Sequence, residues 1–373
     1  MIKILIQQLE EVEDPRPGNA KVHNLADILF IAIAAAVADA DSWYDVEEYA
    51  TMHEDFFRKY LELPGGIPSH DTFNRVFAIM GPLVLEKHYQ EWIKLYRQKY
   101  EGQVICIDGK TIKGANTDQH PVHMVSAFAS EEGISLGQLR VDDKKNELDA
   151  IPKLLDMINV KRCTVTIDAM GCQKNIAKKI IEKNAHYVLA VKGNQCSLHE
   201  AAMETARMVK LDSIHKEVDA DHGRVEERIC RVYGDLSFVQ GSWNWEGLRS
   251  LVEVTRVRYA KKNGKQSAEK AYYITSLPCN KAARTAGAIR SHWKEENQLH
   301  WVLDVGFNEE ASMKRVGNAA ENFARLRCIA LNLIRHDQKR EGGMNKPLKR
   351  KRKAAAWSTK ILECILFSLP YEQ

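Results

Sequence analysis

Two short, largely apolar segments, each followed at once by an aspartate, constrain the fold of this chain most strongly. Val104–Ile107 runs into Asp108, and Thr164–Ile167 runs into Asp168. A continuous apolar run of this length is typical of a strand that is buried on both faces, as in a parallel sheet covered by helices. The chain is therefore predicted to be an α/β protein in which two buried strands end in carboxylates.

The segments around these strands predict their order in the sheet. We expect further strands at 122–129, 134–141 and 187–191, and helices at 147–158 and 173–183. The resulting order is βββαβαβ, and a hairpin meander followed by right-handed crossovers places the first and fourth strands side by side and parallel. Asp108 and Asp168 would then meet at one rim, where open α/β sheets usually carry their sites. This arrangement resembles the mixed sheet of ribonuclease-H-like nucleotidyl-transfer domains.

Other regions predict an all-helical amino-terminal domain and a β-rich insertion within the second half of the sheet domain. The insertion has alternating stretches at 225–233, 251–259 and 271–277. Long helices are expected at 288–305 and 319–335, the latter amphipathic with Arg325 and Arg335 away from its apolar side. The predicted domains are 1–98 (helical), 99–196 with 287–340 (ribonuclease-H-like), 197–286 (β-rich insertion) and 341–373 (basic carboxyl-terminal segment).

Charge is distributed unevenly along the chain. The net charge is +4, but residues 1–100 hold 10 Lys/Arg and 16 Asp/Glu, net −6, which leaves 44 and 34, net +10, for the rest. A polyanion would therefore be bound chiefly by residues 101–373. Within them, residues 346–353 contain six basic side chains in eight. Such a run is typical of a solvated tail, and it could also neutralise phosphates.

The apolar segments also bear on location. The longest, residues 28–38, is shorter than the roughly 20 residues that cross a bilayer, and no secretory signal precedes it. The eight cysteines are far apart and include no C-x-x-C pair, so we expect them to be reduced and mostly buried. These features predict a cytoplasmic protein without a membrane span.

Paired aspartates suit a hard divalent cation, because Mg²⁺ prefers oxygen ligands. Either aspartate alone would more commonly be a turn residue, but their predicted adjacency favours a site. A two-metal clamp on a phosphate needs a third carboxylate. Glu296 is the predicted third acid because it shares a helix face with His292 and His300, whereas Glu295 lies about 100° away.

Several side chains near the predicted rim are candidates for DNA contacts. Lys192 is the best placed, since it follows strand 187–191, although any single lysine is more often a solvated surface charge. Trp293 and Trp301 could stack on unpaired bases, but core packing is the favoured interpretation. A zinc site on His292, Glu296 and His300 lacks the metalloprotease spacing and a cysteine partner. The residues predicted to contact DNA are Lys110, Lys113, Lys192, Asn194, Arg290, His292 and His300.

Taken together, six motifs resemble those of the H-repeat-associated transposases, a bacterial insertion-sequence branch of the DDE class. They are Asp108-Gly-Lys-Thr, Thr166-Ile-Asp-Ala-Met-Gly-Cys-Gln173, Ala190-Val-Lys-Gly-Asn-Gln195, His222-Gly-Arg-Val-Glu226, His292-Trp-Lys-Glu-Glu-Asn-Gln-Leu-His-Trp-Val-Leu-Asp304 and Gly317-Asn-Ala-Ala320. The resemblance covers nearly the whole chain, because the helical segment with Pro68-Ser-His-Asp-Thr72 is similar to the family's transposase-associated domain.

This resemblance implies a catalytic triad of Asp108, Asp168 and Glu296 that holds two Mg²⁺ or Mn²⁺ ions. It implies hydrolysis at the ends of a mobile element and strand transfer of the freed 3′-hydroxyl into target DNA, with DNA as the partner and a possible homodimer. Many DDE relatives also carry a Tyr, an Arg and a Lys around the glutamate. Ile289, His292 and Leu303 occupy those positions here, so the DNA contacts of those residues do not carry over.

Two alternatives to a transposase stay open from the residues alone. One is a nuclease that uses the same site without joining DNA. The other is a DNA-binding protein derived from a transposase that no longer catalyses a reaction, although the presence of all three acids argues against it.

Overall fold

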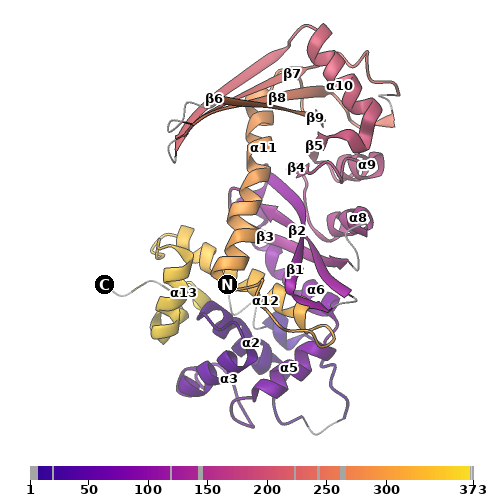
Figure 1. Ribbon diagram of the computed structural model, residues 1–373. Coiled ribbons are helices and arrows are strands. Elements are labelled where there is room, and N and C mark those ends of the chain that lie inside the picture. Colours follow the sequence, from indigo (N-terminus) through magenta and orange to yellow (C-terminus); the bar gives the residue numbers. More distant parts are fainter. Residues whose placement is uncertain are drawn as a thin grey trace.

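The computed structural model of the chain describes residues 7–18, 21–117, 120–141, 146–221, 224–241, 244–260, 266–369 and 371. The molecule is elongated, with a helical region at one end and a sheet that extends from it to the other end (Figure 1). Among the described residues, no helix is both long and apolar enough to cross a membrane. All eight cysteines are free, and six of them are buried, as predicted.

The nine described strands form one mixed sheet in the order β3-β2-β1-β4-β5-β9-β8-β7-β6. β1 and β4, and β4 and β5, pair in parallel, whereas the other neighbours are antiparallel. The predicted parallel pairing of the first and fourth strands is therefore confirmed. The strands are β1 (Val104–Thr117), β2 (His120–Ala129), β3 (Ile134–Val141), β4 (Thr164–Ile167), β5 (His186–Val191), β6 (Ser213–Asp221), β7 (Arg224–Tyr233), β8 (Ser250–Ala260) and β9 (Gln266–Thr275).

β1 is much longer than predicted. The sequence predicted a strand that ends at Ile107, but β1 continues past Asp108 because β2 pairs with it antiparallel as far as Ile112 and Val122 and, after a register shift, at Thr117 and His120. The neighbour of β1 on its other side, β4, pairs with it only as far as Ile107 and ends at Ile167. Asp108 therefore lies inside β1, at the level where its parallel partner stops.

The predicted insertion extends the central sheet rather than standing apart from it. β9 pairs with β5, and β8, β7 and β6 lie successively outward. β6 was not predicted; most of its residues 213–221 are polar, and its apolar side chains Ile214, Val218 and Ala220 are exposed. A short 3₁₀ turn, η2 (Gly193–Gln195), and α10 (Cys196–Met208) connect β5 to this extension.

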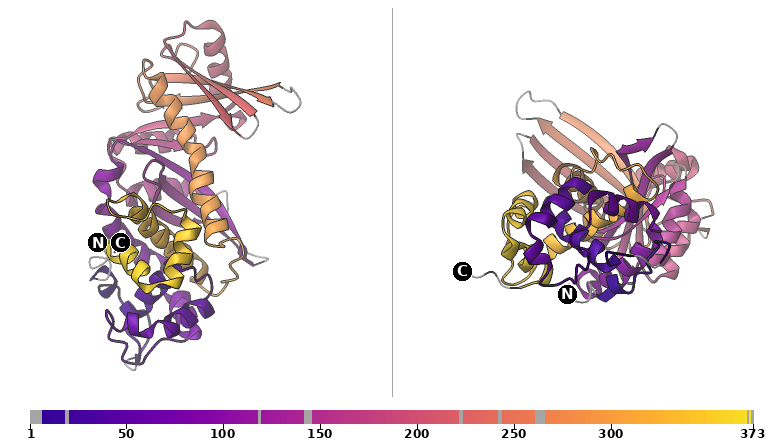
Figure 2. Two further views of the ribbon diagram at one scale, coloured as in Figure 1. Left: turned by 90° about the vertical axis from the view of Figure 1, so that its left-hand side faces the viewer. Right: turned by 90° about the horizontal axis from the view of Figure 1, so that it is seen from below.

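Helices cover both faces of the sheet. α8 (Glu147–Met157), α9 (Lys174–Glu182) and α12 (Ala319–Lys339) pack on the face that Ile105 and Ile107 present. α11 (Ala282–Glu295) covers the face that Val104 and Cys106 present. The predicted helix 288–305 does not stay α-helical, because its second half winds as two π-turns, η4 (Glu296–His300) and η5 (Val302–Gly306). This helix runs from the sheet extension toward the helical end (Figure 2).

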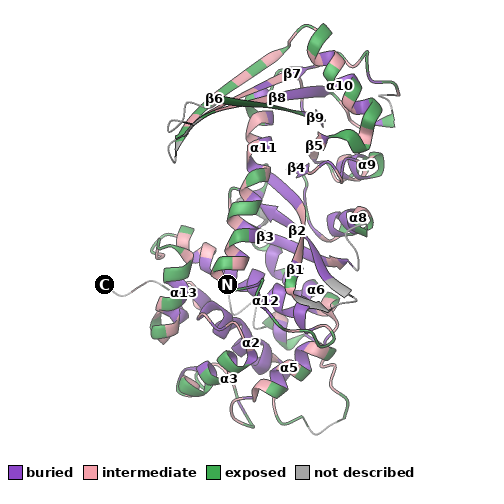
Figure 3. Ribbon diagram, in the orientation of Figure 1, coloured by how far each residue is buried: buried purple, intermediate pink, exposed green. Residues whose placement is uncertain are grey.

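The helical end combines segments from both ends of the chain. α2 is apolar on all sides and buried (Figure 3), as expected of a helix in the middle of a core, and it contacts α12, α13 and α14. Ser42 caps α3 with a capping box, and the Ser69 side chain caps α5. The helices here are α2 (Leu25–Val37), α3 (Trp43–Met52), α4 (Glu54–Phe57), α5 (His70–Ile79), α6 (Pro82–Lys94), α7 (Arg97–Tyr100), α13 (Leu348–Trp357) and α14 (Thr359–Phe367).

The basic run 346–353 is not a solvated tail, contrary to the prediction. Most of it lies in α13, where Lys351 and Arg352 are 0% and 1% exposed. The Arg352 guanidinium lies 2.9 Å from the Asp39 carboxylate and 3.1 Å from that of Asp41. Lys351 pairs with the buried carboxylate of Asp337. These two cations therefore hold the carboxyl-terminal helices against the rest of the protein and are not free for phosphates.

Candidate active site

Asp108 and Asp168 lie side by side at one level of the sheet. Ile107 of β1 is the register partner of Ile167 of β4, and neighbouring strands are about 4.8 Å apart, so the next residue on each strand is adjacent to the other. One carboxylate oxygen of Asp168 accepts hydrogen bonds from the backbone N–H groups of Met170 and Gly171, at 3.0 and 3.3 Å. The tight turn after β4 thus fixes this carboxylate while leaving its other oxygen unused by these bonds.

Negative charge is concentrated around Asp108. Its pKa is raised to about 6, first by burial and then by the carboxylates of Asp168, Glu147 and Glu296, against the opposing effect of a hydrogen bond from the Gly109 N–H. Carboxylates this close disfavour one another's ionised forms. The arrangement therefore favours a bound cation, which would relieve that repulsion.

Glu295 and Glu296 both lie near Asp108 but in different surroundings. Glu296 is exposed and begins the first π-turn, whereas Glu295 is fully buried. Burial, and then the charge of Asp108, raises the pKa of Glu295 well above its ordinary value, which favours the protonated carboxyl. A protonated carboxyl is a poor ligand for a hard cation. Glu296 is therefore the better-suited third acid, and its role stays a prediction.

A second polar cluster lies beneath the carboxylates. Cys106 of β1, and His292 and Glu295 of α11, place one potential ligand atom each within 4.8 Å of one another, so this set could hold a metal ion. The Cys106 thiol lies 3.3 Å from the Ser291 carbonyl oxygen. Burial raises the pKa of Cys106 and of Glu295 and lowers that of His292, which favours the neutral form of all three groups. The zinc-type set suggested by the sequence was different, because it contained Glu296 and His300.

His123 and Glu147 complete the site on the side of β2, and sequence reasoning did not identify either of them. Both side chains are buried and hydrogen-bond each other, and His123 Nδ1 lies 2.8 Å from Thr111 Oγ1. A Cβ atom at Gly109 would lie 2.3 Å from Glu147 Oε1 and 2.7 Å from His123 Nε2. This close approach therefore requires the glycine after Asp108. The Asp108-Gly109 pair was the feature of the sequence that could have pointed to this packing.

Two of the predicted phosphate-binding lysines are paired with acids. Lys110 is 13% exposed and pairs with Asp304 and with Glu309, the latter at 2.9 Å. This arrangement favours a role in holding the segment after η5 against β1. Lys113 is 73% exposed and lies 2.8 Å from Glu310, so a phosphate could displace this weak surface pair.

The other predicted contacts lie on two different elements. Lys192 and Asn194 are exposed after β5, where the Asn194 amide donates to the Ala169 carbonyl oxygen at 2.6 Å and so joins the turns after β4 and β5. Arg290 faces the sheet extension and pairs with Glu217 and Asp219 at 3.0 and 2.7 Å.

The two predicted histidines lie close to the aspartates. His292 Nδ1 lies 3.3 Å from Thr166 Oγ1, and His300 Nδ1 lies 3.8 Å from Asp108 Oδ2. Burial, together with the positive charge of Lys110, lowers the pKa of His300 to about 4. His300 is therefore neutral at neutral pH and could contact DNA only as an uncharged group.

The core-packing interpretation of the two tryptophans is wrong. Trp293 is 53% and Trp301 is 58% exposed. Trp293 lies against the Arg256 guanidinium of β8, with the guanidinium carbon 5.2 Å from the ring centroid. Ala288 and Ile289 of α11 are buried against the sheet instead, and Leu299 and Leu303 are buried in the main core.

Comparison with known protein families identifies the family of the chain. The family model described as "Transposase DDE domain" matches residues 99–333, and the model described as "DDE_Tnp_1-associated" matches residues 6–93. The chain belongs to the DDE transposase family. The resemblance to H-repeat-associated transposases found in the sequence is thereby confirmed at the level of the family.

Full-length relatives support the same conclusion. "Putative transposase YncI" of Escherichia coli O157:H7 is 40% identical, over 98% of this chain and 95% of the relative. "H repeat-associated putative transposase YhhI" of Escherichia coli K12 is 35% identical, over 98% of both chains. A piggyBac transposase synaptic complex with hairpin DNA superposes with a TM-score of 0.44 at 11% identity, covering 98% of this chain and 80% of that chain, a similarity too low to carry an argument.

One of the sequence motifs, Gly317-Asn-Ala-Ala320, serves the fold. Gly317 has a φ of +50°, and a Cβ atom there would lie 2.4 Å from the Ala78 carbonyl oxygen. The Asn318 and Asn322 amides donate to carbonyl oxygens at the end of α5, including that of Met80 at 3.1 and 2.9 Å. The Gly-Asn-Ala-Ala motif thus joins α12 to the amino-terminal helices.

Proposed function

We propose that this transposase cleaves DNA at the ends of an insertion sequence and joins the freed 3′-hydroxyl to target DNA. Asp108, Asp168 and Glu296 would hold two Mg²⁺ or Mn²⁺ ions for this reaction. The observation that carries the proposal is the adjacency of Asp108 and Asp168 at one level of β1 and β4, where burial and then the neighbouring carboxylates raise the pKa of Asp108.

The donor set fits a hard divalent cation. All three proposed ligands are carboxylates, and the nearby charge of Glu147 adds to their mutual repulsion. One oxygen of Asp168 is engaged by backbone N–H groups, which orients the other for a ligand role. When bound, such ions polarise the phosphate and lower the pKa of an attacking water.

The chain's own residues would bind and orient the DNA. Lys192 is exposed after β5, on the rim of the two aspartates, and would hold a phosphate without reading sequence. Asn194 fixes that turn through its bond to Ala169. The bonds of His123 with Glu147 and Thr111 hold the opposite wall of the site against β1. We also infer a homodimer, because two element ends must be brought together for the proposed reaction. We further infer a cytoplasmic location.

The test compares two adjacent glutamates that differ in burial. The purified protein is incubated with supercoiled plasmid carrying the element ends, in Mg²⁺, Mn²⁺ or EDTA. Glu296→Gln is expected to lower cleavage by roughly a thousandfold, the effect of removing a group that stabilises charge in the transition state. Glu295→Gln replaces a protonated carboxyl by a group of similar shape, and its loss is expected to stay within about 10–100-fold, as for a supporting residue.

The outcomes separate the alternatives. DNA binding measured by fluorescence anisotropy in EDTA should be unchanged by Glu296→Gln, and the cleaved 3′ end should appear covalently joined to a second plasmid. Cleavage without joining would identify a nuclease. Metal-independent cleavage, or full activity of Glu296→Gln together with inactivity of Glu295→Gln, would refute the assignment of the site. Binding without any cleavage would indicate an inactive descendant.

A further inference from the structure

A thiol, an imidazole and a carboxyl group meet between β1 and α11. Cys106 of β1 and His292 and Glu295 of α11 bring one potential ligand atom each within 4.8 Å of the others. This cluster shares no residue with the three carboxylates proposed to hold magnesium. It therefore offers a second, chemically different place for a metal ion.

Regular secondary structure places the three side chains. Cys106 lies two residues before Asp108 in β1, so both side chains point to the same face of the sheet, the face that α11 covers. His292 and Glu295 are three residues apart in α11 and are therefore neighbours on one side of the helix. One strand and one helix hold all three groups without the help of a loop.

Two of the three groups are fully buried, and one of their atoms has no partner. Cys106 and Glu295 are each 0% exposed. Glu295 Oε2 makes no hydrogen bond within the described part of the chain, and Glu295 Oε1 lies 3.5 Å from the Ser126 hydroxyl. A buried polar atom without a partner is costly. A bound cation would satisfy this oxygen.

The third group has both an orienting contact and access to solvent. His292 Nδ1 lies 3.3 Å from Thr166 Oγ1 of β4, and metal-binding histidines usually have such a partner on one ring nitrogen. His292 is only partly buried. This leaves a route for the ion and for a water molecule as the fourth ligand.

The ligand types identify the class of metal. Mg²⁺ prefers oxygen, whereas a thiolate, an imidazole and a carboxylate together suit Zn²⁺. Binding would release the thiol and carboxyl protons, and the resulting thiolate and carboxylate balance the two positive charges of the ion. The occupied site is then neutral, as its burial requires. Zinc ligands lie about 2.0–2.3 Å from the ion, so the three atoms would move slightly inward.

We propose that Cys106, His292 and Glu295 bind one Zn²⁺ ion that cross-links β1 to α11. Cys106 lies two residues from Asp108, and Glu295 is adjacent to Glu296. The ion would therefore fix the strand that carries the first proposed acid against the helix that carries the third. This effect on the acids rests on the proposed function, whereas zinc binding itself does not.

The test uses Co²⁺ as a spectroscopic substitute for Zn²⁺, in the full chain with Cys196→Ser, which removes an exposed thiol. Co²⁺ is expected to produce a sulfur-to-cobalt charge-transfer band in the near ultraviolet. An equal amount of Zn²⁺ should abolish the band, and an excess of Mg²⁺ should not. Cys106→Ala is expected to remove the band. It should also lower the affinity for Zn²⁺, measured by competition with a chelating dye, by at least about a hundredfold, the upper end of the loss for a supporting residue.

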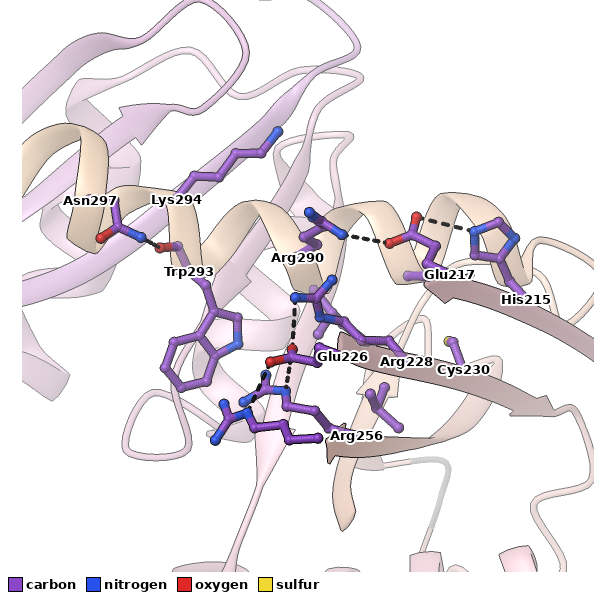
Figure 4. A pocket seen from close by; sticks show the side chains of 14 residues that line it. His215, Glu217, Glu226, Arg228, Cys230, Arg256, Arg290, Trp293, Lys294 and Asn297 are labelled. Carbon is purple, nitrogen blue, oxygen red and sulfur yellow. Dashed lines mark hydrogen bonds and ion pairs between the residues drawn. The ribbon is translucent and has the colours of Figure 1, made fainter. Parts of the chain in front are cut away.

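The matched control is Cys230→Ala. Cys230 of β7 is buried in the same apolar cluster as Cys106. It also has a histidine and a glutamate nearby, since His215 and Glu217 line the same pocket between the sheet extension and α11 (Figure 4). Within the described residues, however, these three groups do not bring ligand atoms within 4.8 Å of one another. Cys230→Ala is therefore expected to leave the cobalt band in place and to change the zinc affinity less than about twofold.

A second measurement does not depend on variants that fold. X-ray absorption at the zinc edge of the unmodified protein, loaded with an equal amount of Zn²⁺, is expected to show one sulfur neighbour at about 2.3 Å and nitrogen or oxygen neighbours at about 2.0–2.1 Å. Glu295→Gln keeps the shape of its side chain and should weaken zinc binding about tenfold or more. A shell of oxygen alone, or a cobalt band that survives Cys106→Ala, would overturn the site.

The zinc site and the proposed function fail separately. If no cobalt band forms while plasmid cleavage still depends on Mg²⁺ and on Glu296, the zinc site is wrong and the proposed function stands. If zinc binds through Cys106 while no cleavage occurs in Mg²⁺, the proposed function is wrong and the zinc site stands.

Discussion

Removing the Arg325 guanidinium is expected to be one of the most destabilising single changes in this transposase. Arg325 of α12 and Glu86 of α6 are each 1% exposed and lie 2.8 Å apart. The guanidinium also contacts the Glu321 carboxylate at 2.9 Å and donates to the Gln138 carbonyl oxygen at 3.2 Å. One side chain thus joins the amino-terminal helices, the carboxyl-terminal helices and β3.

The expected magnitude depends on the charge that the substitution leaves unpaired. In Arg325→Met, the Glu86 carboxylate stays buried and keeps its bonds from the Gln90 amide, at 2.7 Å, and from the Gln138 backbone N–H, but no counter-charge from Arg325. Breaking a buried ion pair from one side costs about 3–5 kcal/mol of unfolding free energy, mainly because the remaining charge is uncompensated. The double variant Glu86→Gln with Arg325→Met removes both charges and is expected to be more stable than Arg325→Met alone.

The loss should depend on pH with a defined sign. Burial raises the pKa of Glu86 even with Arg325 present, although Arg325 opposes that shift. Without Arg325 the folded-state pKa rises further, so the folded protein binds a proton that the unfolded chain has released, and stability falls as pH rises above the unfolded pKa. Urea unfolding, followed by circular dichroism, is expected to show a larger loss at pH 8 than at pH 5. A loss below about 1 kcal/mol, or one that is equal at both pH values, would refute the reasoning.

Two further predictions concern other parts of the chain. Gly109→Ala places a Cβ atom 2.3 Å from Glu147 Oε1. We therefore expect the free energy of unfolding, measured in urea, to fall by about 1–3 kcal/mol, and plasmid cleavage to be reduced. Unchanged stability and activity would contradict the close approach. Burial lowers the pKa of Lys351 to about 8 from an ordinary value of 10.5, so the unfolded chain binds more protons between these values and stability should rise from pH 8 to 9.5. Lys351→Met should reduce that rise relative to the unchanged protein in the same unfolding assay, and an identical pH profile would count against a depressed pKa.

The central sheet could be predicted because its signals are local. The apolar runs before Asp108 and Asp168, and the turn signals between the other segments, specify strands and helices without reference to the rest of the chain. Connection rules then place the first and fourth strands together, and the structure pairs them in parallel. The length of β1 was not predictable in the same way, because its continuation past Asp108 depends on pairing with β2.

Buried charge is where local reasoning failed. Helical periodicity assigned Arg325 to the outward side of its helix, and the basic composition of 346–353 suggested a solvated tail. Arg325, Lys351 and Arg352 are instead among the most buried side chains, because acids from distant segments compensate each of them. A sequence pattern cannot identify such partners, since they are separated by more than two hundred residues in two of the three cases.

The helix that carries Glu296 shows why the candidate site was only partly predictable. An α-helical spacing places His292, Glu296 and His300 on one face, but the π-turn that starts at Glu296 adds backbone and changes the direction of the residues beyond it. Before this turn, His292 and Glu295 lie with Cys106 of β1, while Trp293 lies against the Arg256 guanidinium of β8. Glu295 is thereby buried beside Asp108 while Trp293 stays exposed. The winding of this helix therefore determines which of its side chains lie near Asp108, and an α-helical spacing rule could not supply that winding.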